Sequence, residues 1–419
     1  MKVLLIGNGG REHAIAWKIC QSNLLTKLYV ASGNAGTAQI AENIPILPED
    51  VESIVNFAHD NKIDLVIVGP EVPLAKGLAD RCASYGIPCF GPSKIASQLE
   101  SSKMFAKSIM DACKIPNAKS VTVNSVPQAL NALTIFGLPV VIKADGLAAG
   151  KGVYICKSEK EAKSAIHDIL EEKIFGDAGD NVLIEEFLEG PELSVFAFTD
   201  GKSISPLIAA CDYKRIGIGN KGPNTGGMGA YSPAPFWNKS LETDIQTNIF
   251  EKIINYMDVT HGGYIGVLFA GLMMTNSGPK VLEFNCRLGD PEAQVILPLL
   301  ETDLLSIMNA CVNGTLESIH VKWKSKSAVT VVMASEGYPG HYDIGHEIIG
   351  LNDLGNPNIL VFHAGTRISE GNSITTNGGR VLSVTSVSDT IKEARENIYI
   401  HLPKIQFQGS YNRTDIGLI

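Results

Sequence analysis

Short apolar runs alternate with amphipathic segments along the first hundred residues. The runs predicted as strands and the segments predicted as helices are, in order, 3–6, 12–20, 28–30, 51–58 and 65–68. β-branched runs that alternate with helical spacing are typical of a parallel sheet buried between helices. We therefore predict an open parallel α/β domain over residues 1–100.

The pattern changes after residue 100. Predicted strands at 140–143 and 153–156 are joined by a glycine-rich turn, which indicates an antiparallel hairpin. The other predicted strands and helices are 119–123, 126–135, 159–170, 182–186, 192–199, 267–274, 281–285, 328–333 and a helix after Ser388. We expect an antiparallel sheet with helices on one face over 101–190, a second α+β unit over 191–326, and a last one over 327–419. Residues 211–237 show no periodicity, and so long an irregular stretch indicates a functional loop.

Composition narrows the class of protein. Hydrophobic residues make up 45% of the 419 residues and charged residues 19%, which excludes a disordered chain. The net charge of −9 argues against a general nucleic-acid binder but allows a local basic pocket for phosphates.

No apolar run approaches the ~18 residues of a membrane span, and the apolar start is too short for a secretory signal. The eight cysteines contain no C-x-x-C pair and are expected to be reduced core thiols. We expect a cytoplasmic monomer without nucleic-acid or membrane partners.

A glycine-rich turn, Gly7-Asn8-Gly9-Gly10-Arg11, follows the first predicted strand and opens the first helix. Backbone N–H groups in such a place form an anion site. A dinucleotide fingerprint would need a glycine at Glu12 and an acidic residue at the end of the second strand, where the sequence reads Ala31-Ser32-Gly33-Asn34. The pattern disfavours a nicotinamide cofactor and leaves two interpretations open, a phosphate site and a tight turn without a ligand.

The hairpin turn from Lys143 to Val153 resembles a P-loop but fails its spacing. Three residues separate Gly146 from Gly150, and Gly152 follows Lys151 where Ser or Thr is required. Lysines at the base and tip of a small-residue hairpin favour a lid over a polyphosphate. A solvated turn is the alternative.

Glu283, Asn285 and Arg287 share one face at the end of a predicted strand. Carboxylate and amide oxygens suit Mg²⁺, and a guanidinium one pleat further on can stabilise an anionic transition state. An exposed strand edge would show the same alternation.

Two further stretches have weaker signals. The apolar strand 182–186 runs into an acidic turn that could contact an adenine edge and ribose hydroxyls. Residues 222–231 contain four glycines after Asp212-Tyr213-Lys214-Arg215. They fit a loop around a small zwitterion or phosphate and, equally, a structural Ω-loop.

Together these motifs resemble a known family. Lys143–Gly152, the 185–192 strand and turn, and Glu283-Phe284-Asn285 are similar to the ATP-grasp superfamily. The stretches similar to the phosphoribosylamine–glycine ligase family within it are 7–14, 222–231, 287–292, 363–366 and 378–382. The resemblance implies an ATP-grasp core of two α+β subdomains between the N-terminal α/β domain and a small C-terminal α+β domain. It also implies ATP-dependent joining of glycine to 5-phosphoribosylamine in purine biosynthesis, with ATP and Mg²⁺ or Mn²⁺. Since the chain ends soon after the last motif, we expect the stand-alone form.

The resemblance implies the following roles. The residues expected in catalysis are Lys143, Asp212 and Arg287. The residues expected to bind ATP are Lys103, Lys143, Gly150, Lys151, Glu186, Leu188 and Glu192. The metal ligands are expected to be Glu283 and Asn285. The residues expected to bind substrate are Gly9, Gly10, Arg11, Lys214, Asn224, Thr225, Gly226 and Arg287.

Two positions depart from the family pattern. Residues 269–272 supply no further carboxylate for a metal, and Tyr213 stands where the family usually has histidine. The alternatives are another ATP-grasp ligase or carboxylase, a nucleotide-sensing protein without turnover, and, less favoured, a nicotinamide oxidoreductase.

Overall fold

The N-terminal region forms an open parallel sheet, as predicted. The computed structural model describes residues 1–147 and 152–419. The strand order is β3-β2-β1-β4-β5, and every pairing is parallel. The strands are β1 (Lys2–Gly7), β2 (Lys27–Ser32), β3 (Glu42–Ile44), β4 (Leu65–Val68) and β5 (Cys89–Phe90), with helices α1 (Gly10–Ile19), α2 (Val51–Asp60), α3 (Glu71–Ala75) and α4 (Leu78–Ser84). Val66 and its β4 neighbours are buried on both faces, which explains the continuous apolar run.

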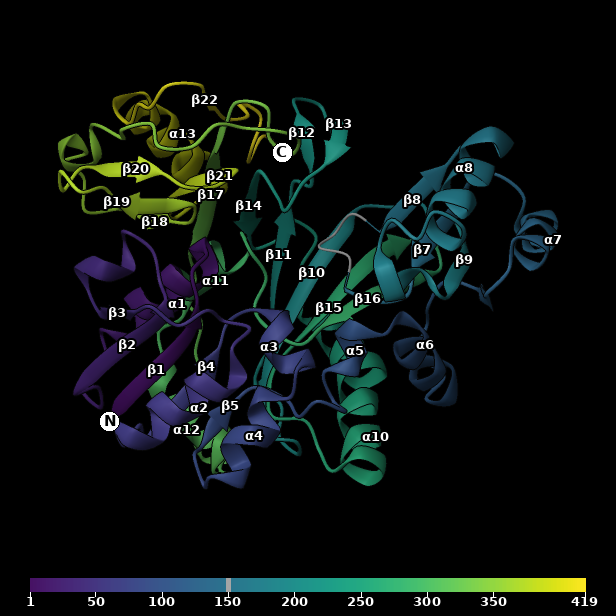
Figure 1. Cartoon of the computed structure of the whole chain (residues 1–419), viewed down its shortest axis with the longest axis horizontal. Coiled ribbons are helices and arrows are strands. Elements are labelled where there is room, and N and C mark those ends of the chain that lie inside the picture. The colour runs from purple at the N-terminus through teal and green to yellow at the C-terminus, as the bar shows by residue number, and fades with distance from the viewer. Residues whose placement is uncertain (148–151) are drawn as a thin grey trace.

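The predicted hairpin lies in a separate four-stranded antiparallel sheet. Its order is β6-β9-β7-β8, with β6 (Ser120–Val123), β7 (Val140–Ala144), β8 (Val153–Cys156) and β9 (Val182–Glu186). Helices α7 (Val126–Phe136) and α8 (Glu159–Leu170) share one hydrophobic cluster with this sheet and lie on its side away from the molecular centre (Figure 1). Helices α5 (Gln98–Ser101) and α6 (Lys103–Ala112) connect this unit to the N-terminal domain.

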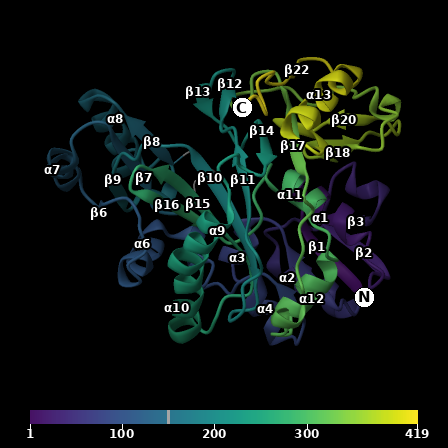
Figure 2. The same ribbon diagram turned by 180° about the vertical axis from the view of Figure 1, so that it is seen from behind.

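A nine-stranded sheet forms the centre of the molecule (Figure 2). Its order is β16-β15-β10-β11-β14-β17-β21-β18, and β22 pairs with β17. The strands are β10 (Glu192–Thr199), β11 (Ile208–Asp212), β14 (Gly229–Ser232), β15 (Gly266–Thr275), β16 (Gly278–Asn285), β17 (Ser327–Ser335), β18 (Ile359–His363), β21 (Arg380–Ser388) and β22 (Ser410–Tyr411). Because β14 pairs with β17, the sheet crosses residue 327 without a break. The last hundred residues therefore extend the central sheet.

The prediction of an irregular loop over 211–237 is wrong. This stretch contains β12 (Arg215–Gly217), β13 (Lys221–Asn224) and β14, and β12 pairs with β13 in a two-stranded ribbon. These strands have three or four residues each and include glycine and proline, so periodicity does not reveal them. Hydrogen bonds to their partner strands hold these short segments in the extended conformation. The remaining elements are α9 (Lys239–Ile245), α10 (Glu251–His261), α11 (Ala293–Leu299), α12 (Leu304–Val312), β19 (Thr366–Ile368), β20 (Ile374–Thr376) and α13 (Ile391–His401).

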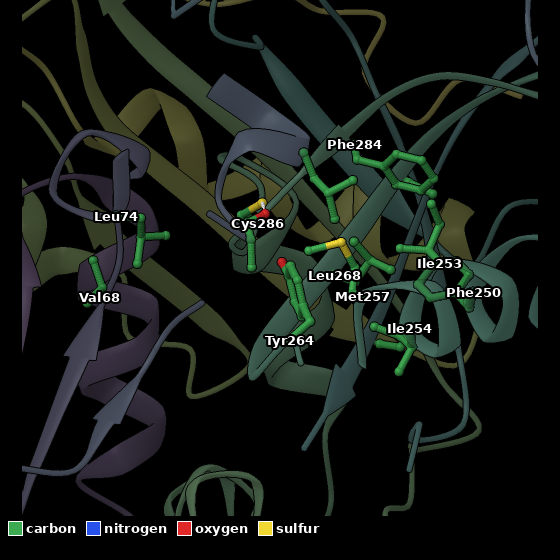
Figure 3. Close-up of a cluster of buried hydrophobic side chains, with 14 of the residues drawn as sticks. Val68, Leu74, Phe250, Ile253, Ile254, Met257, Tyr264, Leu268, Phe284 and Cys286 are labelled. Carbon is green, nitrogen blue, oxygen red and sulfur yellow. Dashed lines mark hydrogen bonds between the residues drawn. The ribbon is translucent and has the colours of Figure 1, made fainter. Parts of the chain in front are cut away.

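One hydrophobic core joins the N-terminal domain to the central sheet. Val68 and Leu74 belong to it on one side, and Phe250 and Phe284 on the other, with Cys286, the residue after β16, between them (Figure 3). Close packing of this kind fixes the relative position of the elements it joins. The end of β16 is therefore held beside the carboxyl edge of the parallel sheet.

The cysteines are free thiols, but they are not all in the core. Cys20 is exposed, and Cys89 and Cys113 are half-buried, whereas the other five are buried. Across residues 1–147 and 152–419, no helix has the length and apolar character that spanning a membrane requires.

Two buried histidines join α1 to the C-terminal region. The backbone N–H of His363 donates to Nδ1 of His13 at 2.8 Å, and the two rings lie 5.5 Å apart. Burial, with a smaller contribution from His363, lowers the pKa of His13 to about 3, and burial lowers the pKa of His363 to about 4. Both rings are therefore neutral in the folded protein at neutral pH.

This pair predicts a loss of stability in acid. The unfolded chain binds protons at both histidines below pH ~6.5, whereas the folded chain does not. The free energy of unfolding that the two neutral histidines contribute is therefore complete above that pH. It decreases as the pH falls toward their folded-state pKa values of about 3 and about 4, and about 2 kcal/mol for each histidine is lost at pH 5. Urea denaturation at pH 7 and pH 5 measures it. His13→Gln should reduce the pH dependence, and exposed His59→Gln should not; an equal dependence in both variants would contradict the assignment.

Candidate active site

Glu283 on β16 faces a group of positive side chains. Burial alone would raise its pKa, but the ammonium groups of Lys214, Lys143 and Lys103 and the Arg287 guanidinium lower it, and the net pKa lies below the ordinary value. Opposite charges within a few ångströms favour the ionised carboxylate. The site therefore holds a carboxylate anion surrounded by cations contributed by four separate segments.

The chemistry of Glu283 and Asn285 fits a divalent cation. The two residues lie on one face of β16, and the cross-strand neighbour of Glu283 is Gly271, which leaves space beside the carboxylate. No hydrogen bond of the Asn285 side-chain amide is found among the described residues, although this residue is only 9% exposed. In residues 1–147 and 152–419, no group of three or more His, Cys, Asp and Glu side chains is placed to hold a metal. A cation here would complete its shell with phosphate and water oxygens.

Arg287 lies between two carboxylates that sequence reasoning missed. Its Nε lies 3.0 Å from Glu71 Oε2, and its Nη2 lies 2.8 Å from Glu100 Oε1. Glu100 also accepts a 2.7 Å hydrogen bond from the Cys286 backbone, and burial raises the pKa of this carboxyl. Glu71 follows the end of β4, so its position at the carboxyl edge of a parallel sheet was a usable signal. No such signal marks Glu100.

Lys143 at the base of the predicted lid and Lys103 of α6 both contact groups of the protein itself. Lys143 Nζ lies 2.6 Å from Glu185 Oε2, and Lys103 Nζ donates to the Gly146 carbonyl at 2.9 Å. Lys143 is only 6% exposed. Gly150 and Lys151, expected to bind ATP, lie outside the described residues. The structure thus brings Lys103 and Lys143 together at the base of the hairpin.

The residues expected around adenine and ribose lie near the β9–β10 turn. The Glu186 carboxylate accepts a 3.0 Å hydrogen bond from the Lys119 backbone and pairs with Lys280 at 3.1 Å. Leu188 is buried in a small cluster with Ala118 and Met273. Glu192 forms an ion pair with Lys214. Apolar side chains beside charged and polar groups are the combination that suits a planar base and its ribose.

Asp212 lies next to this ion pair. Ser194 of β10 pairs with Ala210 of β11, and continuing this register by two residues places Glu192 opposite Asp212. Burial raises the pKa of Asp212 to about 7, with Lys214 lowering it and the carboxylates of Glu292 and Glu192 raising it. Burial therefore favours the protonated form of the Asp212 carboxyl.

Two backbone N–H groups of the glycine-rich turn donate hydrogen bonds to carboxylates of the protein itself. The Gly9 N–H donates to Glu12 Oε2 at 2.7 Å, and the Arg11 N–H donates to Asp290 Oδ2 at 3.1 Å. The Arg11 guanidinium is buried against Glu12 at 2.6 Å. Gly10 packs so closely that an added Cβ would lie 2.6 Å from Gln294. These bonds fit a tight turn. Among the described residues no acceptor is found for the N–H groups of Asn8 and Gly10, so the interpretation as a phosphate site stays a prediction.

The segment 224–226 joins the central sheet to the C-terminal region. Asn224 ends β13 and is exposed, whereas the Thr225 N–H donates to the Lys214 carbonyl at 2.7 Å. Arg380 Nη1 donates to the Gly226 carbonyl at 2.6 Å and to the Asp290 carbonyl at 2.7 Å. These contacts order the segment beside Lys214.

Comparison with known proteins identifies the family. Models described as phosphoribosylglycinamide synthetase match the chain as N domain over residues 1–100, ATP-grasp (A) domain over 101–293 and C domain over 328–419. A phosphoribosylamine–glycine ligase of Caldanaerobacter subterraneus subsp. tengcongensis is 46% identical over 100% of this chain and 99% of its own length. The trifunctional purine biosynthetic protein adenosine-3 of Gallus gallus is 48% identical over 99% of this chain, which spans only 42% of that protein.

Solved structures agree with the sequence comparison. The crystal structure of phosphoribosylamine–glycine ligase from Thermotoga maritima superposes with a TM-score of 0.87 at 32% identity, covering 99% of this chain and 100% of that one. Both the sequence and the fold therefore match along the whole chain, and the chain belongs to the phosphoribosylamine–glycine ligase family of ATP-grasp enzymes.

Proposed function

We propose that the chain joins glycine to 5-phosphoribosylamine with ATP, giving glycinamide ribonucleotide, ADP and phosphate in de novo purine biosynthesis. The observation that supports this most strongly is the ionised Glu283 surrounded by Lys103, Lys143, Lys214 and Arg287. A carboxylate and a triphosphate repel each other, so their reaction requires fixed positive charge at the point of contact. In the proposed reaction a glycine carboxylate oxygen attacks the γ-phosphorus and ADP leaves.

The site residues divide between positioning and charge stabilisation. We propose that Glu186 and Leu188 contact the adenine, Glu192 the ribose, and Lys103 and Lys143 the phosphates. Gly150 and Lys151 of the hairpin turn would complete the phosphate contacts. Holding both reactants in one orientation supplies much of the acceleration in phosphoryl transfer.

Glu283 and Asn285 would hold the divalent cation. Mg²⁺ or Mn²⁺ bound there would neutralise charge on the transferring phosphoryl group. The lowered pKa of Glu283 keeps this carboxylate available as a ligand at neutral pH.

The second step joins the amine to the activated glycine. The phosphoribosylamine nitrogen attacks the acyl carbon of glycyl phosphate, phosphate leaves, and the nitrogen loses a proton. Arg287 would stabilise the phosphate oxygens, while Asp212, Lys214 and the 224–226 segment would contact substrate. Gly9, Gly10 and Arg11 would contact substrate through the backbone of the turn, at the edge of the parallel sheet.

We propose a cytoplasmic monomer that acts on small molecules. We also propose division into units 1–100, 101–190, 191–326 and 327–419.

An ADP-release assay with single omissions tests the function. ADP should form only when glycine, freshly generated phosphoribosylamine, ATP and Mg²⁺ are all present. Stimulation by bicarbonate in place of glycine would favour an ATP-grasp carboxylase. ATP binding without turnover under any of these conditions would favour a nucleotide sensor.

A further inference from the structure

Three buried ionisable side chains meet beneath the hairpin. Lys107 of α6, Lys143 of β7 and Glu185 of β9 are 7%, 6% and 4% exposed. Lys143 Nζ lies 2.6 Å from Glu185 Oε2, and Lys107 Nζ lies 3.2 Å from Glu185 Oε1. Each oxygen of one carboxylate therefore has its own lysine.

The strand register explains why these groups meet. Val141 of β7 pairs with Glu185 of β9, so Lys143, two residues further along β7, lies on the same face as Glu185. Val140, Ile142 and Ile184 on the opposite face belong to the core with α7 and α8. The lysine–glutamate face is thus the one turned toward α6 and the central sheet (Figure 1).

The two lysines differ in how fully they are bonded. Lys107 donates to Asn117 Oδ1 at 2.6 Å and to the Ala118 carbonyl, and with Glu185 this accounts for all three of its N–H donors. Among the described residues, Lys143 has two acceptors, Glu185 and the Leu282 carbonyl at 3.2 Å. Lys107 is fully bonded, whereas within residues 1–147 and 152–419 Lys143 retains one donor that a ligand could use.

The charges of the three groups do not balance. Two ammonium groups face the one carboxylate of Glu185. Lys103 lies near them, where burial lowers its pKa and the carboxylates of Glu283 and Asp145 raise it. Unbalanced buried charge is costly unless an ion of opposite sign completes the group. The arrangement suits an anion that approaches Lys143.

We infer that Lys107 is a positioning residue that neutralises Glu185 and so leaves Lys143 available to the ATP phosphates. Lys107 does not contact the nucleotide in this scheme. Without it, Lys143 would be the one ion-pair partner left to Glu185 in the part of the chain that the structure describes, and Glu185 would draw that ammonium away from the phosphates. The inference rests on the proposed ATP binding at this site, not on the identity of the acceptor substrates.

Binding measurements on the full chain test it without turnover. Lys107→Met should weaken binding of Mg²⁺ with a non-hydrolysable ATP analogue about tenfold, the scale of one charged contact, and leave adenosine binding unchanged. Exposed Lys163→Met on α8 removes a lysine from a surface pair with Glu159 and is the matched control, expected to bind both ligands as wild type does. Equal loss of adenosine and ATP-analogue binding would show a merely structural role and overturn the inference.

A double variant separates the charge effect from packing. In Lys107→Met/Glu185→Gln no carboxylate competes for Lys143, so analogue binding should recover above that of Lys107→Met. A double variant that binds no better than the single one would contradict the inference. Should Lys107→Met fail to fold, Glu185→Gln alone decides: its ATP-analogue affinity relative to adenosine should exceed that of wild type, and a lower ratio refutes the scheme. A wild-type chain that binds the analogue but makes no product would overturn the proposed function alone.

Discussion

Arg287→Lys should lower the rate of ADP release with both substrates by about 10²–10³-fold. The guanidinium contacts Glu71 and Glu100 through different nitrogens and still borders the Glu283 site. An ammonium group keeps the charge but cannot bond in two directions within one plane. The lysine side chain would therefore pair with only one of the two carboxylates and would no longer be oriented toward the reacting phosphate.

Arg287→Lys tests the role of the guanidinium more specifically than Arg287→Ala, because it keeps the positive charge. Removing the positive charge would leave two carboxylates without a cation, and breaking a buried pair typically costs about 3–5 kcal/mol. Thermal melts should therefore show Arg287→Ala far less stable than wild type, and Arg287→Lys only slightly so. Arg81→Lys is the matched control, because Arg81 forms a similar pair with Glu52 on the surface. A fully active Arg287→Lys enzyme would refute the role assigned to the guanidinium.

Glu283→Gln should abolish metal-dependent turnover, with a loss of about 10³-fold or more, because the amide cannot supply the anionic ligand. The four cations around Glu283 would remain, so the variant should still bind ATP without metal. Titration of Mg²⁺ against bound nucleotide measures the lost metal affinity.

The control for this change is Glu159→Gln, which removes a carboxylate from a surface pair with Lys163. It should retain wild-type metal affinity and turnover. If Glu283→Gln bound Mg²⁺–nucleotide as tightly as wild type, the cation would have to be held elsewhere.

Much of the fold followed from local pattern. The strands at Leu65–Val68, Val153–Cys156 and Val182–Glu186 agree with the predicted ranges, because buried parallel strands and hairpins leave short β-branched runs bounded by glycine. The short strands within 211–237 were missed, since three-residue ladders have no period of their own and depend on remote partners.

The candidate site was predictable only in part. Glu283 and Asn285 lie on one strand and Arg287 lies two residues beyond its end, so their alternation in the sequence predicted the three together. Glu71 and Glu100 lie 216 and about 187 residues from Arg287 along the chain and belong to other elements. Lys107 belongs to no motif, and Glu185 begins the 185–192 stretch without a role of its own being predicted; burial and their shared contact distinguish the two residues.

The amino-acid sequence by itself determined the class of most elements outside 211–237, the family of the chain and the residues of the central motifs. Periodicity and turn chemistry are local properties, and a run of ordered motifs identifies a family without coordinates. The tertiary structure alone decided which charges face one another. Two carboxylates constrain Arg287, one carboxylate is shared by Lys107 and Lys143, and the glycine-rich turn bonds to Glu12 and Asp290. Such pairings depend on packing between distant segments, because a side chain's partner is set by the core that brings the segments together and not by its neighbours in the chain.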